Sequence, residues 1–238
     1  MELNIEENGL VTPVHELGDE RLASIDLLAR DASALVRDDS RAILGITGSP
    51  GAGKSTLVNL LLARIRVANG DEWVAHIPMD GFHLADVQLD RLGARARKGA
   101  PDTFDVAGYA HLLERVKRET DTPLYVPGFD RTLEQPLAAA LVVPPAARLV
   151  ITEGNYLLLD DPLWARARRA IDTIWFVASD EDARIERLVA RHLQFGKNPE
   201  EARAWVSSTD QRNSDLVAST YRKADRVIVN GGADWSFA

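Results

Sequence analysis

The sequence contains no cysteine among its 238 residues. This absence excludes disulfides, thiolate metal sites and a cysteine nucleophile, and it fits a cytosolic protein. No run of about 18 apolar residues occurs, so no membrane span is expected. The stretch Met1–Glu7 is acidic where a secretory signal peptide would be basic. We therefore expect a cytoplasmic protein without a membrane partner.

The chain also lacks an excess of positive charge, since 36 acidic residues outnumber 28 lysines and arginines. The formal net charge is −8, which argues against broad nucleic-acid binding. Hydrophobic residues make up 45% of the chain, enough for a sizeable core. We expect an N-terminal arm and helix over residues 1–40, followed by a single α/β domain over residues 41–238. The sequence leaves the oligomeric state open, including a homo-oligomer.

The most informative stretch has the spacing G-x-x-x-x-G-K-S of a phosphate-binding loop. An apolar run, Ala42–Thr47, precedes it, and apolar residues at helical spacing follow it. Glycines let the backbone turn its N–H groups inward toward phosphate oxygens, and the following helix adds its positive N-terminus. A plain glycine turn between a strand and a helix is the alternative, which this context disfavours. The candidate phosphate-site residues are Gly48, Ser49, Pro50, Gly51, Ala52, Gly53, Lys54, Ser55 and Thr56.

Two further predicted strands end in acids. Trp73–Met79 is followed by Asp80, and Arg148–Tyr156 contains Glu153. Ligands of open parallel sheets bind at the carboxyl ends of the strands, so Asp80 can take a proton from a hydroxyl or hold Mg²⁺. Glu153 suits a Walker B role, and the candidate metal ligands are Ser55, Asp80 and Glu153. A turn aspartate before glycine and an ordinary strand-end glutamate remain the alternatives.

The remaining elements follow from hydrophobic periodicity and helix signals. The expected strands include 172–178 and 226–230. Asp105 is the expected N-cap of the helix over 106–118. The expected helices are 21–37, 54–68, 84–92, 106–118, 162–170, 180–195 and 200–221. Prolines in Thr122–Thr132 argue against a central strand. With Pro136–Val143 this segment could form an antiparallel excursion.

Several side chains are candidates for binding a substrate. The basic loop Arg95–Asp102 is either solvated or a rim that attracts an anionic substrate. His83 fits a structural or substrate-edge role better than metal binding. The candidate substrate residues include His83, Arg97, Lys98, Asp102, Tyr125, Phe129, Asp130 and Arg131.

The helix over 180–195 carries arginines on one face. Like charges at this spacing repel, and only Arg184 has helical acids, Asp180 and Glu181, to compensate it. Arg187 and Arg191 have none, which suggests that they bind an external anion; two solvated surface arginines are the alternative. The helix–turn–helix over about 180–222 is typical of a lid.

Four segments together resemble the phosphoribulokinase, uridine kinase and pantothenate kinase family of phosphate-loop kinases. They are Gly48–Thr56, Met79–Phe82, Arg97–Asp105 and Thr152–Asn155, and the resemblance covers about residues 40–230. Small bacterial nucleoside kinase-like or fructokinase-like members are most similar. The resemblance implies a three-layer phosphate-loop fold with a five-stranded parallel sheet in the order 2-3-1-4-5.

The family resemblance also implies residue roles. Asp80 would be the catalytic base, with Ser55 and Glu153 around Mg²⁺. Lys54, the third candidate catalytic residue besides Asp80 and Arg191, is expected from the loop motif to reach the β- and γ-phosphates. Arg191 would contact the transferring phosphate, and Asn213 would lie near the acceptor. Asn155 is a further candidate substrate residue.

We therefore expect transfer of the γ-phosphate of ATP to a hydroxyl of a small metabolite, such as a sugar, a nucleoside or a pantothenate-like compound. One alternative is a GTPase, since Asp90–Gly93 matches D-x-x-G, but no apolar strand precedes it. The other is a nucleotide-dependent regulatory ATPase without metabolite kinase activity, which would consume ATP without a phosphorylated product.

Overall fold

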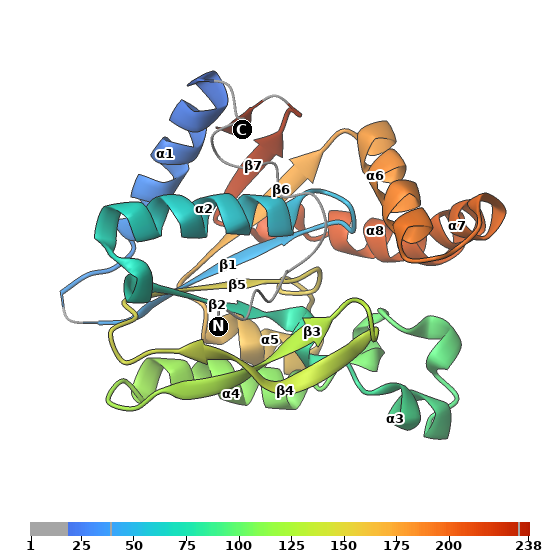
Figure 1. The fold of residues 1–238 in the computed structure, drawn as a ribbon, viewed down its shortest axis with the longest axis horizontal. Coiled ribbons are helices and arrows are strands. Elements are labelled where there is room, and N and C mark those ends of the chain that lie inside the picture. The colour runs from blue at the N-terminus through green and yellow to red at the C-terminus, as the bar shows by residue number, and fades with distance from the viewer. Residues whose placement is uncertain (1–18, 39, 233) are drawn as a thin grey trace, which may run out of the picture.

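The computed structural model describes residues 19–38, 40–232 and 234–238. The expected arm over residues 1–18 lies outside these ranges. Helices cover both faces of a central sheet, giving three layers (Figure 1). Within the described ranges, no helix combines the length and apolar character needed to cross a bilayer.

The central sheet has six strands in the order β2-β5-β1-β6-β7-β8. They are β1 (Ala42–Gly48), β2 (Val74–Pro78), β5 (Leu149–Glu153), β6 (Thr173–Ser179), β7 (Arg226–Asn230) and β8 (Trp235–Phe237). The first five in this order are parallel, and β8 runs antiparallel to β7. The prediction of a five-stranded parallel sheet in the order 2-3-1-4-5 is therefore wrong for the sheet as a whole. The three residues of β8 are too few to show an alternating pattern, and this strand is held by burial of Trp235.

Strand β1 is buried on both faces, which explains its uninterrupted apolar sequence. Successive side chains point to opposite faces of the sheet. Ile43 accordingly belongs to one hydrophobic cluster, while Leu44 and Ile46 belong to the other. The sheet therefore separates two cores.

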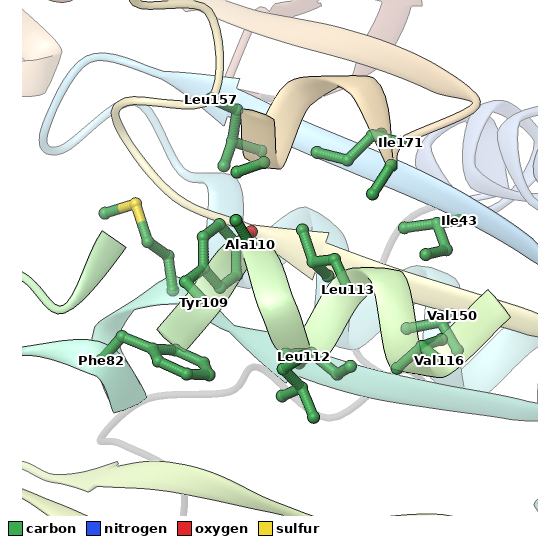
Figure 2. Close-up of a cluster of buried hydrophobic side chains, with 14 of the residues drawn as sticks. Ile43, Phe82, Tyr109, Ala110, Leu112, Leu113, Val116, Val150, Leu157 and Ile171 are labelled. Carbon is green, nitrogen blue, oxygen red and sulfur yellow. The ribbon is translucent and has the colours of Figure 1, made fainter. Parts of the chain in front are cut away.

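One core lies under helices α1 (Asp19–Ser33) and α2 (Lys54–Asn69). The other lies under α4 (Val106–Arg118) and α5 (Pro162–Arg169). In this second core Leu113 and Val116 of α4 lie toward Val150 of β5 (Figure 2). The predicted cap of α4 is confirmed, since Asp105 accepts a hydrogen bond from the backbone N–H of Gly108.

The expected antiparallel excursion is present as a separate hairpin of β3 (Leu124–Asp130) and β4 (Gln135–Val143). Short α3 (Asp86–Arg91) precedes α4 in the chain. Helix α6 (Glu181–Gln194) begins the expected lid.

The helix predicted over 200–221 is present over residues 199–218, but it is not regular. Helices α7 (Pro199–Trp205) and α8 (Gln211–Ala218) are joined by a π-helical turn, Val206–Asp210. The hydroxyls of Ser207 and Ser208 in this turn both donate to the carbonyl of Ala204. Such side-chain bonds compete with the regular α-helical pattern.

Arg41 joins the sheet to the loops beneath it. Its guanidinium is buried and donates five hydrogen bonds, all to backbone carbonyls. The acceptors are the carbonyls of Val116, Glu119, Pro144, Pro145 and Ala147. No carboxylate of the described residues pairs with Arg41. Carbonyl dipoles therefore stabilise its charge, and two of them, from Val116 and Glu119, lie at the C-terminal end of α4.

Candidate active site

A cavity of about 510 Å³ lies at the carboxyl ends of β1, β2 and β5. Its walls come from the loop after β1, the turn after β2, the end of β5, the β3–β4 hairpin and the helices over 181–218. These segments are far apart in the sequence, and the parallel sheet brings them to one edge.

The loop after β1 is held in a conformation that requires glycine. Gly51 and Gly53 have φ angles of 79° and 98°. A Cβ on Gly51 would lie 2.7 Å from the carbonyl oxygen of Arg184, and one on Gly53 would lie 2.6 Å from the Nδ2 of Asn230. Asn230 also donates from this nitrogen to the carbonyl of Ala52 at 2.9 Å. The loop is therefore packed against α6 and β7 without room for a side chain at either glycine.

Lys54 begins α2 and lines the cavity. Its side chain is largely buried, and Nζ donates to the carbonyl of Ser49 at 3.1 Å. Burial lowers the pKa of Lys54 to about 8, although the charges of Glu153 and Asp80 oppose this shift. An anion bound beside Lys54 would favour its charged form.

Ser55 and Glu153 lie together. The Ser55 hydroxyl donates to Oε1 of Glu153 at 3.0 Å. Burial raises the pKa of the Glu153 carboxyl, and the charge of Lys54 opposes this. In the described part of the chain no three His, Cys, Asp or Glu side chains are grouped so that they could hold a metal ion. A hydroxyl and carboxylates are nevertheless hard oxygen donors of the kind that Mg²⁺ prefers.

Asp80 lies in the turn after β2, one strand away from Glu153 in the sheet, since Pro78 pairs with Glu153. The Asp80 carboxylate forms an ion pair with Arg131 from the hairpin. Burial alone would raise the pKa of Asp80, but Arg131 and weaker contributions from other nearby cations lower it to about 2. The carboxylate is therefore ionised.

His83 packs between two aromatic rings. Its ring centroid lies 4.0 Å from that of Phe104 and 4.9 Å from that of Phe129. Nδ1 is 2.8 Å from the backbone carbonyl of Asp80 and can donate to it. Burial lowers the pKa of His83. A neutral ring at this position forms part of the cavity wall.

The three arginines of α6 have different surroundings. Arg184 is buried and donates to Oε1 of Gln211 at 2.6 Å. Arg187 donates to the carbonyl of Gly51 at 2.7 Å, so it does have a partner, in the phosphate-binding loop. Arg191 lines the cavity, is exposed, and makes no hydrogen bond or ion pair with any residue that the structure describes.

Most of the candidate residues line this one cavity. They are Pro50, Gly51, Gly53, Lys54, Ser55, Thr56, Asp80, His83, Lys98, Phe129, Arg131, Glu153, Asn155, Arg187, Arg191 and Asn213. The remainder do not line it: Gly48, Ser49, Ala52, Arg97, Asp102, Tyr125 and Asp130. Arg97 pairs with Asp102 on the surface, and Asp130 accepts from two backbone N–H groups of the hairpin turn.

The cavity also contains residues that sequence reasoning missed. Among them are Asp86, Phe104, Glu134, His192, Phe195, Lys197, Trp205 and Asp210. His192 and Asp210 are joined by a 2.7 Å contact between Nε2 and Oδ2, and Lys197 lies 4.5 Å from the Trp205 ring centroid. No local motif marks the last five of these residues, because their proximity depends on how α6 and α7 fold back.

No protein-family model matches this chain. A Schizosaccharomyces pombe protein named "Putative uridine kinase C227.14" is 35% identical over 210 residues, which cover 87% of this chain and 88% of that protein. "ATP-dependent kinase YFH7" of Lachancea thermotolerans is 30% identical over 198 residues, covering 67% of this chain and 56% of that protein. A solved structure, "putative fructose transport system kinase from Silicibacter sp. TM1040", is 33% identical with a TM-score of 0.77, covering 85% of this chain and 98% of its own.

Proposed function

The chain belongs to the phosphoribulokinase, uridine kinase and pantothenate kinase family of phosphate-loop kinases and is an ATP-dependent kinase of small molecules, and on this basis we propose how its residues transfer the γ-phosphoryl group to an acceptor hydroxyl. One observation carries the proposal. Lys54, Ser55, Asp80 and Glu153 line a single cavity at the ends of adjacent strands.

The loop from Gly48 to Ser55 binds the phosphates of ATP. Its glycine conformations turn backbone N–H groups toward an anion, and the N-terminus of α2 adds partial positive charge. Lys54 leaves the Ser49 carbonyl to reach the β- and γ-phosphates.

Ser55, Glu153 and Asp80 would hold Mg²⁺ through oxygen atoms. Their donor set fits this ion, which usually binds one or two carboxylates together with substrate phosphates and water. When bound, Mg²⁺ would supply neutralisation of the charge on the phosphate oxygens.

Asp80 is the general base for the acceptor. The acceptor oxygen attacks the γ-phosphorus, the bond between that phosphorus and the ADP oxygen breaks, and the hydroxyl proton passes to the Asp80 carboxylate. A carboxylate with a pKa of about 2 is a weak base. Because the transition state of phosphoryl transfer is loose, orienting the hydroxyl matters more than basicity.

The lid, about residues 180–222, carries Arg191 to the γ-phosphoryl group. Arg184 and Arg187 fix α6 to Gln211 and to the phosphate-binding loop, and Arg191, one turn beyond Arg187, has no hydrogen-bond partner among the described residues. Its planar donors suit the equatorial oxygens of the transferring group.

The acceptor lies against the turn after β2 and the β3–β4 hairpin. His83, Lys98, Phe129, Arg131, Asn155 and Asn213 are the proposed contacts. A cavity of about 510 Å³ suits a small metabolite.

The test supplies [γ-³²P]ATP and a small-molecule cell extract to the wild type and to Lys54→Ala. The proposal expects a labelled metabolite with the wild type and none with the variant. ATP consumption without any labelled metabolite would instead support a regulatory ATPase.

A further inference from the structure

The guanidinium of Arg131 is only partly used in the structure. It carries five N–H donors. Among the described residues it makes one hydrogen bond, from Nη2 to the Asp80 carboxylate. The side chain lines the cavity and is 23% exposed, so its other donors lie at the cavity wall.

An aromatic ring holds this guanidinium in place. The Cζ of Arg131 lies 4.9 Å from the centroid of Phe129, close enough for a cation–π contact. The same ring has the Nζ of Lys98 at 5.7 Å. Phe129 in turn packs on His83, whose ring is fixed by Phe104. Packed aromatic rings therefore fix the orientation of the planar Arg131 guanidinium and of its paired N–H groups.

The other acids nearby do not offer Arg131 a permanent partner. Asp86 already pairs with Lys98 and with Arg95, each at 2.8 Å. The Glu134 side chain is exposed and forms no ion pair with any described residue. Asp80 is the present partner, and it must turn to the acceptor hydroxyl during the reaction. Arg131 would then be left half-buried without an ion-pair partner, since Glu134 and Glu153 contribute favourable charge but form no ion pair with it among the described residues, and such a loss is unfavourable.

We propose that the acceptor is a hydroxylated anion whose carboxylate or phosphate group binds the Arg131 fork while its hydroxyl lies at Asp80. This inference rests on the proposed kinase function. Arginine matches both anions because its paired N–H groups fit two oxygen atoms at once. The acceptor's anion replaces Asp80 as the partner of Arg131, so binding the correct acceptor also releases the Asp80 carboxylate for the hydroxyl.

The first experiment separates acceptors by charge. A small-molecule cell extract is passed over anion-exchange resin, and the bound and unbound pools are each incubated with the enzyme and [γ-³²P]ATP. Acceptor activity is expected in the bound pool. Treating this pool beforehand with alkaline phosphatase, which is then removed, abolishes the activity if the anion is a phosphate ester and preserves it if the anion is a carboxylate.

The outcomes separate the two proposals. Activity confined to the unbound pool would overturn the anionic acceptor while leaving the kinase function intact. No labelled product from either pool would overturn both.

The second experiment assigns the anion to Arg131. With the acceptor purified from the active pool, Arg131→Gln should raise the acceptor KM roughly 10- to 100-fold, as expected for losing hydrogen bonds to a charged group, with the ATP KM within about twofold. Arg131→Lys should recover only part of the loss, because the fork is absent. Arg115→Gln removes another paired arginine, on α4 and outside the cavity, and should change neither constant.

A purely structural role of Arg131 predicts a different result. If the side chain only orients Asp80, then Arg131→Gln lowers kcat and leaves the acceptor KM unchanged. That result would overturn the inference. Thermal melting of each variant shows whether the fold is retained.

Discussion

Replacing Arg191 with alanine should remove activity without removing stability. Arg191 is exposed and has no hydrogen bond or ion pair within the described residues, so its removal costs the folded state neither kind of interaction. Surface changes of this kind alter the free energy of unfolding by about 0.5 kcal/mol or less. For a chain of this size that corresponds to a shift in Tm of roughly 2 °C or less.

The catalytic effect is expected to be far larger. An arginine that meets the transferring phosphoryl group is worth about 10³ or more in kcat. At about 1.4 kcal/mol for each tenfold change, the loss is about 4 kcal/mol of transition-state stabilisation. Arg191→Lys should restore little, since lysine provides a point charge and no planar fork.

Two variants make this test specific. Arg203→Ala removes an exposed arginine of α7 that does not line the cavity, and it should behave as the wild type. Arg187→Ala removes the bond to the Gly51 carbonyl, so it should raise the ATP KM and lower Tm. The assay is steady-state kinetics with the purified acceptor, together with thermal melting. A kcat for Arg191→Ala within a few-fold of wild type would refute the assignment.

Three further predictions concern other parts of the molecule. Lys98→Ala, which frees Asp86, should raise the acceptor KM more than the ATP KM in steady-state kinetics; the reverse order would place this side chain on the ATP side. Arg41→Ala should lower the free energy of unfolding by about 2–5 kcal/mol in urea titrations, because five backbone carbonyls, two of them in buried hydrogen bonds, lose their donor, whereas an unchanged midpoint would mean that water replaces the guanidinium. Ser55→Ala should raise the Mg²⁺ concentration needed for half-maximal activity by about tenfold, the scale seen for metal-site partners; an unchanged requirement would remove Ser55 from the metal site.

The parts of the site that follow from local sequence could be predicted. The phosphate-binding loop is defined by glycine spacing between a buried strand and a helix. Asp80 and Glu153 follow or end apolar runs, and the topology of parallel strands brings such positions together. Strand β7 has the predicted bounds, Arg226–Asn230, because its apolar run is short and well delimited.

Side-chain direction in the hairpin could not be predicted. Tyr125 and Phe129 would lie on the same face of a regular strand, since successive side chains alternate. The register of β3 shifts between Val126 and Gly128, so Phe129 lines the cavity while Tyr125 is 69% exposed. Such irregularities redirect the side chains beyond them; Pro127 and Gly128 mark this one in the sequence, but they do not show which way the following side chains turn.

Contacts between segments that are distant in the sequence could not be predicted either. Arg131 was a candidate only through its place in the excursion, and its ion pair with Asp80 spans 51 residues. Adjacent residues of the basic loop also have partners in different places. Arg97 pairs with Asp102 on the surface, whereas Lys98 pairs with Asp86 in the cavity. In each case tertiary packing selects the partner.

The most direct test of the catalytic arrangement is Asp80→Asn in a single assay of phosphoryl transfer and ATP binding. Asparagine keeps the shape of the side chain and loses its capacity to accept the hydroxyl proton. With [γ-³²P]ATP and the purified acceptor, kcat should fall on the order of 10²- to 10⁴-fold, the range for a positioned base, while the Kd for ATP changes only slightly. A variant that labels the acceptor at a rate within a few-fold of wild type would contradict the assignment of Asp80 as the base.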